Sequence, residues 1–227
     1  MNTTHAESHQ TSSPPQSVAI SGIIFGMFYL ISLILMRLAV PANPADPGDW
    51  LTDPVRRGWV RVSLNLIPFV GIAFLWFMAA LRNRIGMYED QVFSTVFLGS
   101  GILFVATLFA AVSVSRGVLD TFANEKVRPS EIETYQFSRG LAYVLMNTFG
   151  IRMEAVFMFV TSTIGLRTKV LARFISFIGF AAGLVLLLGI TDFGWIALVF
   201  PLWALMISIY ILMTDLPADR DVISKDL

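Results

Sequence analysis

The sequence predicts an all-α fold, a polytopic bundle of six transmembrane helices, on three observations. Hydrophobic residues make up 56% of the 227 residues and charged residues only 14%, whereas a soluble domain carries about 25% charged residues. The mean hydropathy is +0.71. The charges are also clustered, and they leave long apolar runs between them. Because lipid offers backbone amides no hydrogen-bond partner, such runs cross a membrane as helices.

Each apolar run approaches the roughly 20 residues that a helix needs to span the hydrocarbon core. The runs do not alternate apolar with polar residues as strands of a membrane β-barrel do. We therefore expect a disordered polar tail at 1–17, a transmembrane domain at 18–214 and a polar tail at 215–227. The predicted spans are residues 18–37, 62–81, 92–114, 141–166, 174–191 and 194–214.

The segment between the first two predicted spans is rich in proline and aspartate. Within it, Asp53 followed by Pro54 is typical of a helix N-cap with proline in the first turn. The second helix is therefore expected to begin ahead of the membrane.

Several classes of function are excluded by residue types that the membrane domain lacks. The chain has no cysteine, and its two histidines, His5 and His9, lie in the polar tail. This excludes thiolate catalysis, iron–sulfur ligation, a transmembrane haem with two histidine ligands and a histidine zinc site. The net charge is zero, with no basic patch to suggest a nucleic-acid partner. We expect no metal and no cofactor, and we assign no catalytic residue.

Arg152 and Glu154 are the most informative residues, since both fall near the centre of the fourth predicted span. A central charge costs about 2.5–3.5 kcal/mol on insertion scales, so two of them require a reason. Two positions apart, they point about 200° apart around a helix and do not simply pair. They either form a polar site that binds a charged group or relays protons, or they lock helices together.

Other polar or helix-kinking residues are predicted at a similar depth, in the outer half of the bundle. Together they suggest an outward-facing polar cavity floored by Arg152 and Glu154. The alternative is that such residues only kink helices and bond across them. The residues in question are Asn65, Pro68, Asn147, Asp192 and Pro201, and the two asparagines join Arg152 and Glu154 as candidate binding residues.

Two glycine pairs, Gly22 with Gly26 and Gly179 with Gly183, have the spacing of a small-residue packing motif. One interpretation is close helix packing inside the monomer. The other is a face for a homodimer or a partner protein.

The basic residues of short loops predict the orientation in the membrane. Arg82 and Arg84 lie in one such loop, and Arg167, Lys169 and Arg173 in another. With six helices, both loops lie on the side of the termini. Although arginines also occur on the opposite side, this pattern favours cytoplasmic termini in a multi-pass protein of the cell membrane.

Two stretches carry a resemblance to other proteins. The first, NLIPFVGIAFLW at 65–76, continues into Leu81-Arg-Asn-Arg84, and the second is WIALVFPLW at 195–203. They resemble uncharacterised multi-pass membrane proteins of bacteria, a family of unknown function. The resemblance implies a bacterial inner-membrane protein, and it implies no activity and no catalytic residue.

Three classes of function remain open. Scarce catalytic residue types favour a non-enzymatic membrane component that binds a partner protein or a lipid. The alternative is a small transporter or channel with a mid-membrane polar site at Arg152 and Glu154. An intramembrane enzyme has less support, because acid–base chemistry usually needs a second positioned group beside Glu154.

Overall fold

The computed structural model describes residues 16–41, 43, 46–85, 91–122, 131–188 and 195–223. Throughout these ranges the regular structure is helical, which confirms the all-α prediction for the described part. The elements are α1 Gln16–Ala39, η1 Asp49–Thr52, α2 Pro54–Ile85, α3 Gln91–Phe122, α4 Ile132–Val144, η3 Leu145–Gly150, α5 Ile151–Thr168, α6 Arg173–Leu188, η4 Ile196–Leu198 and α7 Val199–Ile223.

Five helices in the described ranges are long and apolar enough to cross a membrane. One of them, Ile132–Thr168, joins α4, the π-helix η3 and α5 into a single rod. The predicted span at 174–191 corresponds to α6, which has 16 described residues. Such a helix is about 24 Å long, short of the hydrocarbon thickness of about 30 Å. Five described helices are therefore long and apolar enough to span a membrane, and the sixth span stays a prediction.

The helix boundaries extend past the apolar runs. The Asp53 side chain accepts a hydrogen bond from the backbone N–H of Val55 at 2.9 Å, which confirms the predicted cap of α2 at Pro54. At the other end of the chain, α7 continues to Ile223, so the first part of the predicted polar tail is helical. An apolar run therefore predicts the apolar part of a helix and not its full length. Residues 1–15 lie outside the described part.

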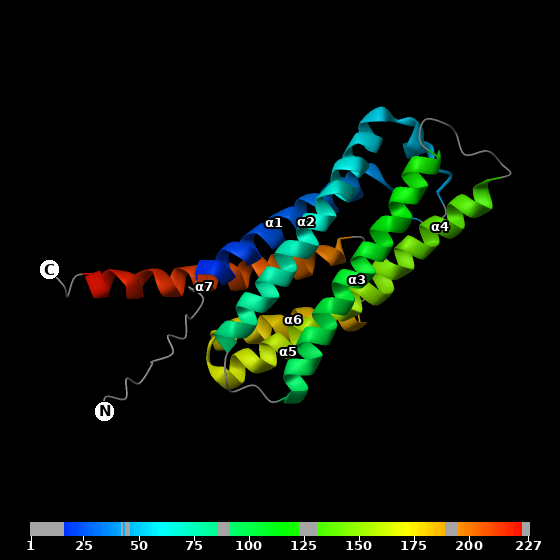
Figure 1. Cartoon of the computed structure of the whole chain (residues 1–227). Helices are drawn as coiled ribbons and strands as arrows, with labels where there is room; N and C mark the ends of the chain where they lie inside the picture. The colour runs from blue at the N-terminus through cyan, green and yellow to red at the C-terminus, as the bar shows by residue number, and fades with distance from the viewer. Residues whose placement is uncertain are drawn as a thin grey trace, which may run out of the picture.

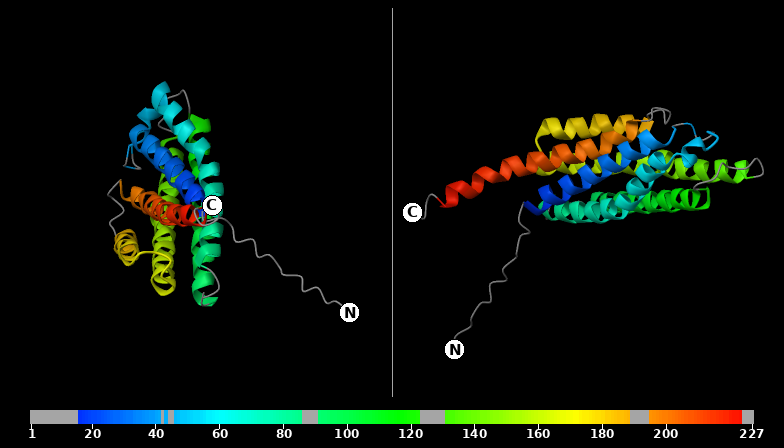
Figure 2. Two further views of the ribbon diagram at one scale, coloured as in Figure 1. Left: turned by 90° about the vertical axis from the view of Figure 1, so that its left-hand side faces the viewer. Right: turned by 90° about the horizontal axis from the view of Figure 1, so that it is seen from above.

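The long helices run roughly side by side, as Figure 1 shows. Helix α1 packs along α2 and α7, α3 packs along α2 and α5, and α6 packs on α5. The start of α1 and the end of α7 lie at one end of the molecule, which we call the terminal end (Figure 2). Helix η1 and the start of α4 lie at the opposite end, which we call the loop end.

Both glycine motifs pack against helices of the same chain. A Cβ on Gly26 would lie 3.2 Å from the carbonyl oxygen of Pro201 in α7, and one on Gly183 would lie 3.3 Å from that of Ala155 in α5. These are the close backbone approaches that the motif favours. Dimerisation of the chain stays a prediction.

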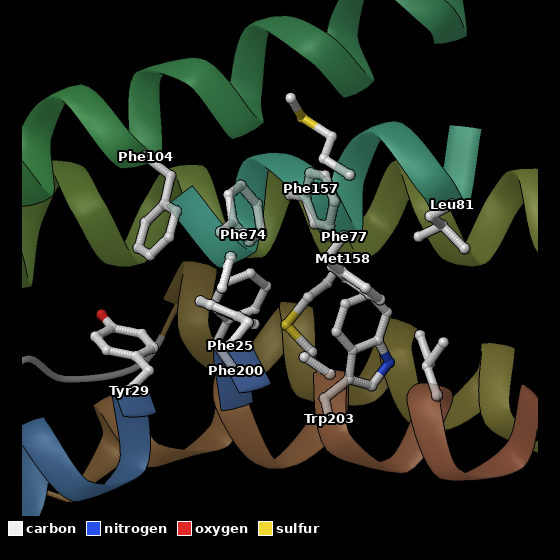
Figure 3. Packing of buried hydrophobic residues seen from close by; sticks show 14 of the residues in the cluster. Phe25, Tyr29, Phe74, Phe77, Leu81, Phe104, Phe157, Met158, Phe200 and Trp203 are labelled. Atoms are coloured by element: carbon white, nitrogen blue, oxygen red, sulfur yellow. The ribbon is translucent and has the colours of Figure 1, made fainter. Parts of the chain in front are cut away.

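Two groups of buried apolar residues hold the bundle together. The first, the main core, is crowded with aromatic rings at centroid distances such as 5.1 Å between Phe74 and Phe104, and Figure 3 shows it from close by. The second, the outer cluster, lies at the loop end and consists of Ala39, Trp50, Leu51, Val60, Leu64, Val118, Leu119, Phe122 and Tyr135.

Candidate functional site

A cavity of about 210 Å³ lies between the main core and the outer cluster. Along α1 its lining runs from Tyr29 to Val40 just beyond the helix, a length on the order of 15 Å at the rise of an α-helix. The remaining lining comes from η1, which supplies Trp50, from α2, α3, α4, η3 and η4, and from Pro41 and Trp195 in the connecting segments. The cavity is therefore elongated along the helix axes.

One side of the cavity, the back wall, is formed by α2 and α3 and is closed. The residues of these helices that line it are mostly buried: Val60, Ser63, Ile67, Leu108 and Ala111 are each below 6% exposed. Close packing of α2 with α3 seals this side.

The opposite side, the front, is formed by α1, α4 and η4 and is partly open. Its lining residues Leu33, Arg37, Tyr143 and Leu198 are only half-buried, and Trp195 is 43% exposed. Helix α1 packs along α2 and α7 while α4 packs along α3, so α1 and α4 face each other across the cavity. The opening therefore lies between these two helices.

The loop end of the cavity is covered by a network of polar contacts. Trp50 donates from Nε1 to the Tyr135 hydroxyl at 2.9 Å. Arg139 of α4 forms an ion pair with Asp46 and donates from Nη2 to the carbonyl oxygen of Pro41 at 3.1 Å. Because these contacts and the outer cluster cover this end, the opening faces sideways.

At the other end, Tyr29 forms the floor of the cavity. Its hydroxyl donates to Oε1 of Glu154 at 2.9 Å. Glu154 is fully buried, and no described residue forms a hydrogen bond with its Oε2. Glu154 thus lies directly behind the floor and does not line the cavity itself. The predicted floor at Glu154 is therefore one residue layer too deep.

Arg152 lies apart from both the cavity and Glu154. Its Nη1 donates to the carbonyl oxygen of Thr148 at 2.7 Å, within the π-helix η3. No ion pair joins it to Glu154, although the structure describes both side chains. The expectation that two-residue spacing keeps them apart is met. Wide π-turns such as η3 occur frequently at functional sites.

The two asparagines have different positions. Asn147 lines the cavity from η3, and its Nδ2 donates to the carbonyl oxygen of Tyr143 at 3.1 Å. Asn65 is exposed and accepts a hydrogen bond from Nη1 of Arg116 at 3.1 Å. It does not line the cavity, because its neighbours Ser63 and Leu64 occupy the inward face of α2. Asp192 lies outside the described residues.

Sequence reasoning missed polar residues that line the cavity, among them Tyr29, Ser32, Arg37 and Ser63. Tyr29 and Ser32 lie three positions apart in the first apolar run, a spacing that places polar groups on one helix face. That spacing was the available signal. Ser32 and Ser63 approach each other to 2.9 Å between their hydroxyl oxygens, joining α1 to α2 beside the cavity. Arg37, at the end of a span, gave no comparable signal.

Arg37 is the most notable charged residue of the lining. It lies in the last turn of α1, is half-buried, and forms no hydrogen bond or ion pair with a described residue. The other arginine of the lining, Arg139, is neutralised by Asp46. Among the described lining residues there is no carboxylate. The cavity thus has apolar walls and a net positive charge contributed by Arg37.

No protein-family model, curated protein or solved structure matches the chain. Its five long apolar helices are consistent with an integral membrane protein. The case for a function therefore depends on the cavity and on the side chains around it.

Proposed function

We propose that this protein is a non-enzymatic, six-helix protein of the bacterial inner membrane that binds one alkyl chain of a membrane lipid in the cavity. The observation that carries the proposal is the shape of the cavity. It is closed by α2 and α3 at the back, by the main core at one end and by the outer cluster at the other. It is open between α1 and α4, on the side of the bundle that faces lipid.

The size of the cavity fits a single chain. Its volume of about 210 Å³ is below the roughly 300–1,000 Å³ of pockets for drug-sized ligands. Its length along α1 and its apolar walls suit an extended chain and not a bulky two-chain lipid. The lining includes Met36 and Met146, whose flexible side chains adapt to an irregular guest.

The driving force is the filling of space. An alkyl chain gains little by exchanging lipid for protein, because both surroundings are apolar. An empty apolar cavity, however, destabilises a protein by about 24 cal/mol per Å³. That cost applies to an enclosed space, so for this partly open cavity it is an upper limit to the gain from filling it. A chain that fills even part of the cavity is therefore favoured.

The placement in the membrane has separate support. Arg82 and Arg84 end α2, Arg167 is in the last turn of α5, and Arg173 begins α6. These basic residues belong to the terminal end, which the positive-inside rule places in the cytoplasm. The cavity would then lie in the outer leaflet, with α6 as the sixth span.

The proposal is tested by counting bound alkyl chains. Wild-type protein extracted from membranes is expected to carry one single-chain ligand in native mass spectrometry. In Ala111→Leu, a larger side chain on the back wall takes part of the cavity, so bound ligand is expected to fall about tenfold. Ala110→Leu is the matched control, since Ala110 is exposed on the same helix. Wild-type protein without ligand, or equal retention by Ala111→Leu, would overturn the proposal.

A small transporter or channel is the second candidate, favoured by the Tyr29–Glu154 hydrogen bond behind the cavity floor. A transported group would have to pass the packed rings of the main core, where Phe104 and Phe200 lie 5.3 Å apart. Because of this obstacle, we rank ligand binding above transport as the function. A proton flux into proteoliposomes that Glu154→Gln abolishes would reverse the order, whereas no flux in the wild type would remove this candidate.

A further inference from the structure

The charge of the cavity lining indicates which alkyl chains it accepts. We propose that Arg37 selects ligands with an acidic head group, so that the ligand is a single-chain anionic amphiphile with a carboxylate or phosphate. This inference rests on the proposed function, because it requires the alkyl chain to occupy the cavity.

The charge of Arg37 is not compensated by any described residue. A half-buried cation is costly unless an anion or hydrogen-bond acceptor compensates it. Arg139 and Arg116 have such partners in Asp46 and Asp120. No described residue supplies one for Arg37. A guanidinium in this position is suited to a ligand, since its planar fork matches carboxylate and phosphate oxygens.

The position of Arg37 agrees with the orientation of a lipid in the membrane. It lies in the last turn of α1, near the loop end, whereas Tyr29 forms the floor two turns deeper. A chain that enters between α1 and α4 can thus place its head group at the membrane surface beside Arg37 and its tail toward Tyr29. Lipids of that leaflet have the same orientation, so the ligand enters without turning over.

No negative charge competes with the ligand among the described residues of the lining. The described residues around the cavity include Arg37 and Arg139 and neither aspartate nor glutamate. Asp46 is committed to Arg139, and Glu154 lies behind Tyr29 at the far end. A cationic amphiphile would therefore meet like charge at the opening, and a neutral one would leave Arg37 uncompensated.

The test compares ligands that share a chain and differ in the head group. Hexadecanoate, hexadecyl phosphate and neutral hexadecanol are titrated into delipidated, full-length protein in a non-ionic detergent. Bound ligand is counted by native mass spectrometry. Wild-type protein is expected to bind the two acids at least about tenfold more tightly than the alcohol, the effect of one charge-assisted hydrogen bond. The ratio between the acids separates a carboxylate from a phosphate source.

Variants assign this preference to one residue. Arg37→Gln is expected to lose the preference for acids while keeping the wild-type affinity for hexadecanol, and Arg37→Lys is expected to keep part of it. Arg61→Gln is the matched control, because Arg61 is exposed on α2 and does not line the cavity. Its preference should equal that of the wild type.

The outcomes separate this inference from the proposed function. If wild-type protein binds all three ligands equally, or if Arg37→Gln keeps the preference, the selection by Arg37 is wrong while alkyl-chain binding stands. If none of the three ligands binds, or if Ala111→Leu binds them as the wild type does, the cavity proposal fails and this inference fails with it.

Discussion

At the scale of single residues, the hydrogen bond between Tyr29 and Glu154 is the polar contact buried most deeply near the cavity. Both side chains are fully buried, and they join α1 to α5 through the bundle interior. The bond fixes the position of the ring that forms the cavity floor. Its loss would therefore affect both the stability of the bundle and the shape of the cavity.

Tyr29→Phe is expected to destabilise the protein by about 1–3 kcal/mol. Glu154 then loses the hydrogen bond at Oε1, and its Oε2 already has no hydrogen-bond partner among the described residues. Thermal unfolding in detergent measures the difference. Tyr210→Phe is the control, since it removes the hydroxyl of the half-buried Tyr210 of α7, and this hydroxyl forms no hydrogen bond with a described residue. Equal melting temperatures for both variants would show that the Tyr29 bond contributes nothing.

The contact between Arg139 and Asp46 gives a second prediction for single residues. Both side chains are largely buried, at 12% and 9% exposure. Removing one partner of a buried pair costs about 3–5 kcal/mol, because the other charge stays behind uncompensated. Arg139→Ala is thus expected to loosen the covered loop end, seen as faster amide exchange at Trp50 and Leu51.

The double variant Arg139→Ala with Asp46→Ala checks that interpretation. Without either charge no uncompensated group remains, so stability and slow exchange should return in part. Exchange in Arg139→Ala as slow as in the wild type would argue against a closing role for this pair.

At the scale of helices, the sequence located the elements well and their ends poorly. Predicted spans 62–81 and 92–114 lie within α2 and α3, each of 32 residues. Hydropathy reports where lipid surrounds a helix, whereas polar residues can continue the same helix into water. For α6 the predicted span, 174–191, is longer than the described helix, which has 16 residues.

The candidate site could be predicted only in part, for reasons of helix geometry. The number of residues from the start of a span predicts how deep a residue lies in the membrane. This count correctly predicted that Asn147 and Glu154 lie close to the cavity. Rotation about the helix axis depends on the packing partners, so depth alone made Asn65 a candidate binding residue although its side chain is exposed. The π-helix η3 also shifts the face that α5 presents, and no local pattern predicted it.

Close packing of α1 on α7 gives a prediction for this scale. A Cβ at Gly26 would meet the Pro201 carbonyl oxygen at 3.2 Å and the Leu205 side chain at closer range. Gly26→Ala is therefore expected to push the helices apart and to destabilise the bundle by about 1–3 kcal/mol. Thermal unfolding in detergent measures this, and a loss below about 0.5 kcal/mol would contradict the packing argument.

Gly99→Ala provides the matched control for that substitution. A Cβ at Gly99 of α3 meets nothing within 4 Å. Its effect should stay within about 0.5 kcal/mol or be slightly stabilising, since alanine has the higher helix propensity.

At the scale of the whole molecule, the proposed orientation, with both termini in the cytoplasm, would put the cavity in the outer leaflet. The chain has no cysteine, so single cysteines can be introduced without a background. Thr52 is exposed at the loop end, so the cysteine of Thr52→Cys should react with an impermeant maleimide in intact cells. Lys169→Cys, exposed at the terminal end, should react only after the membrane is opened. The reverse pattern would place the cavity in the cytoplasmic leaflet.

The most direct measurement of alkyl-chain binding is photolabelling in native membranes with a fatty acid that carries a diazirine on its chain. Leu108 on the back wall of the cavity is 2% exposed, and Trp76 on the outer face of α2 is 70% exposed. Bulk lipid reaches Trp76 but has no route to Leu108 except through the cavity. Adducts at Leu108 and its neighbours in the wild type, reduced in Ala111→Leu, are the predicted result. Labelling confined to outward-facing positions such as Trp76 would contradict the account.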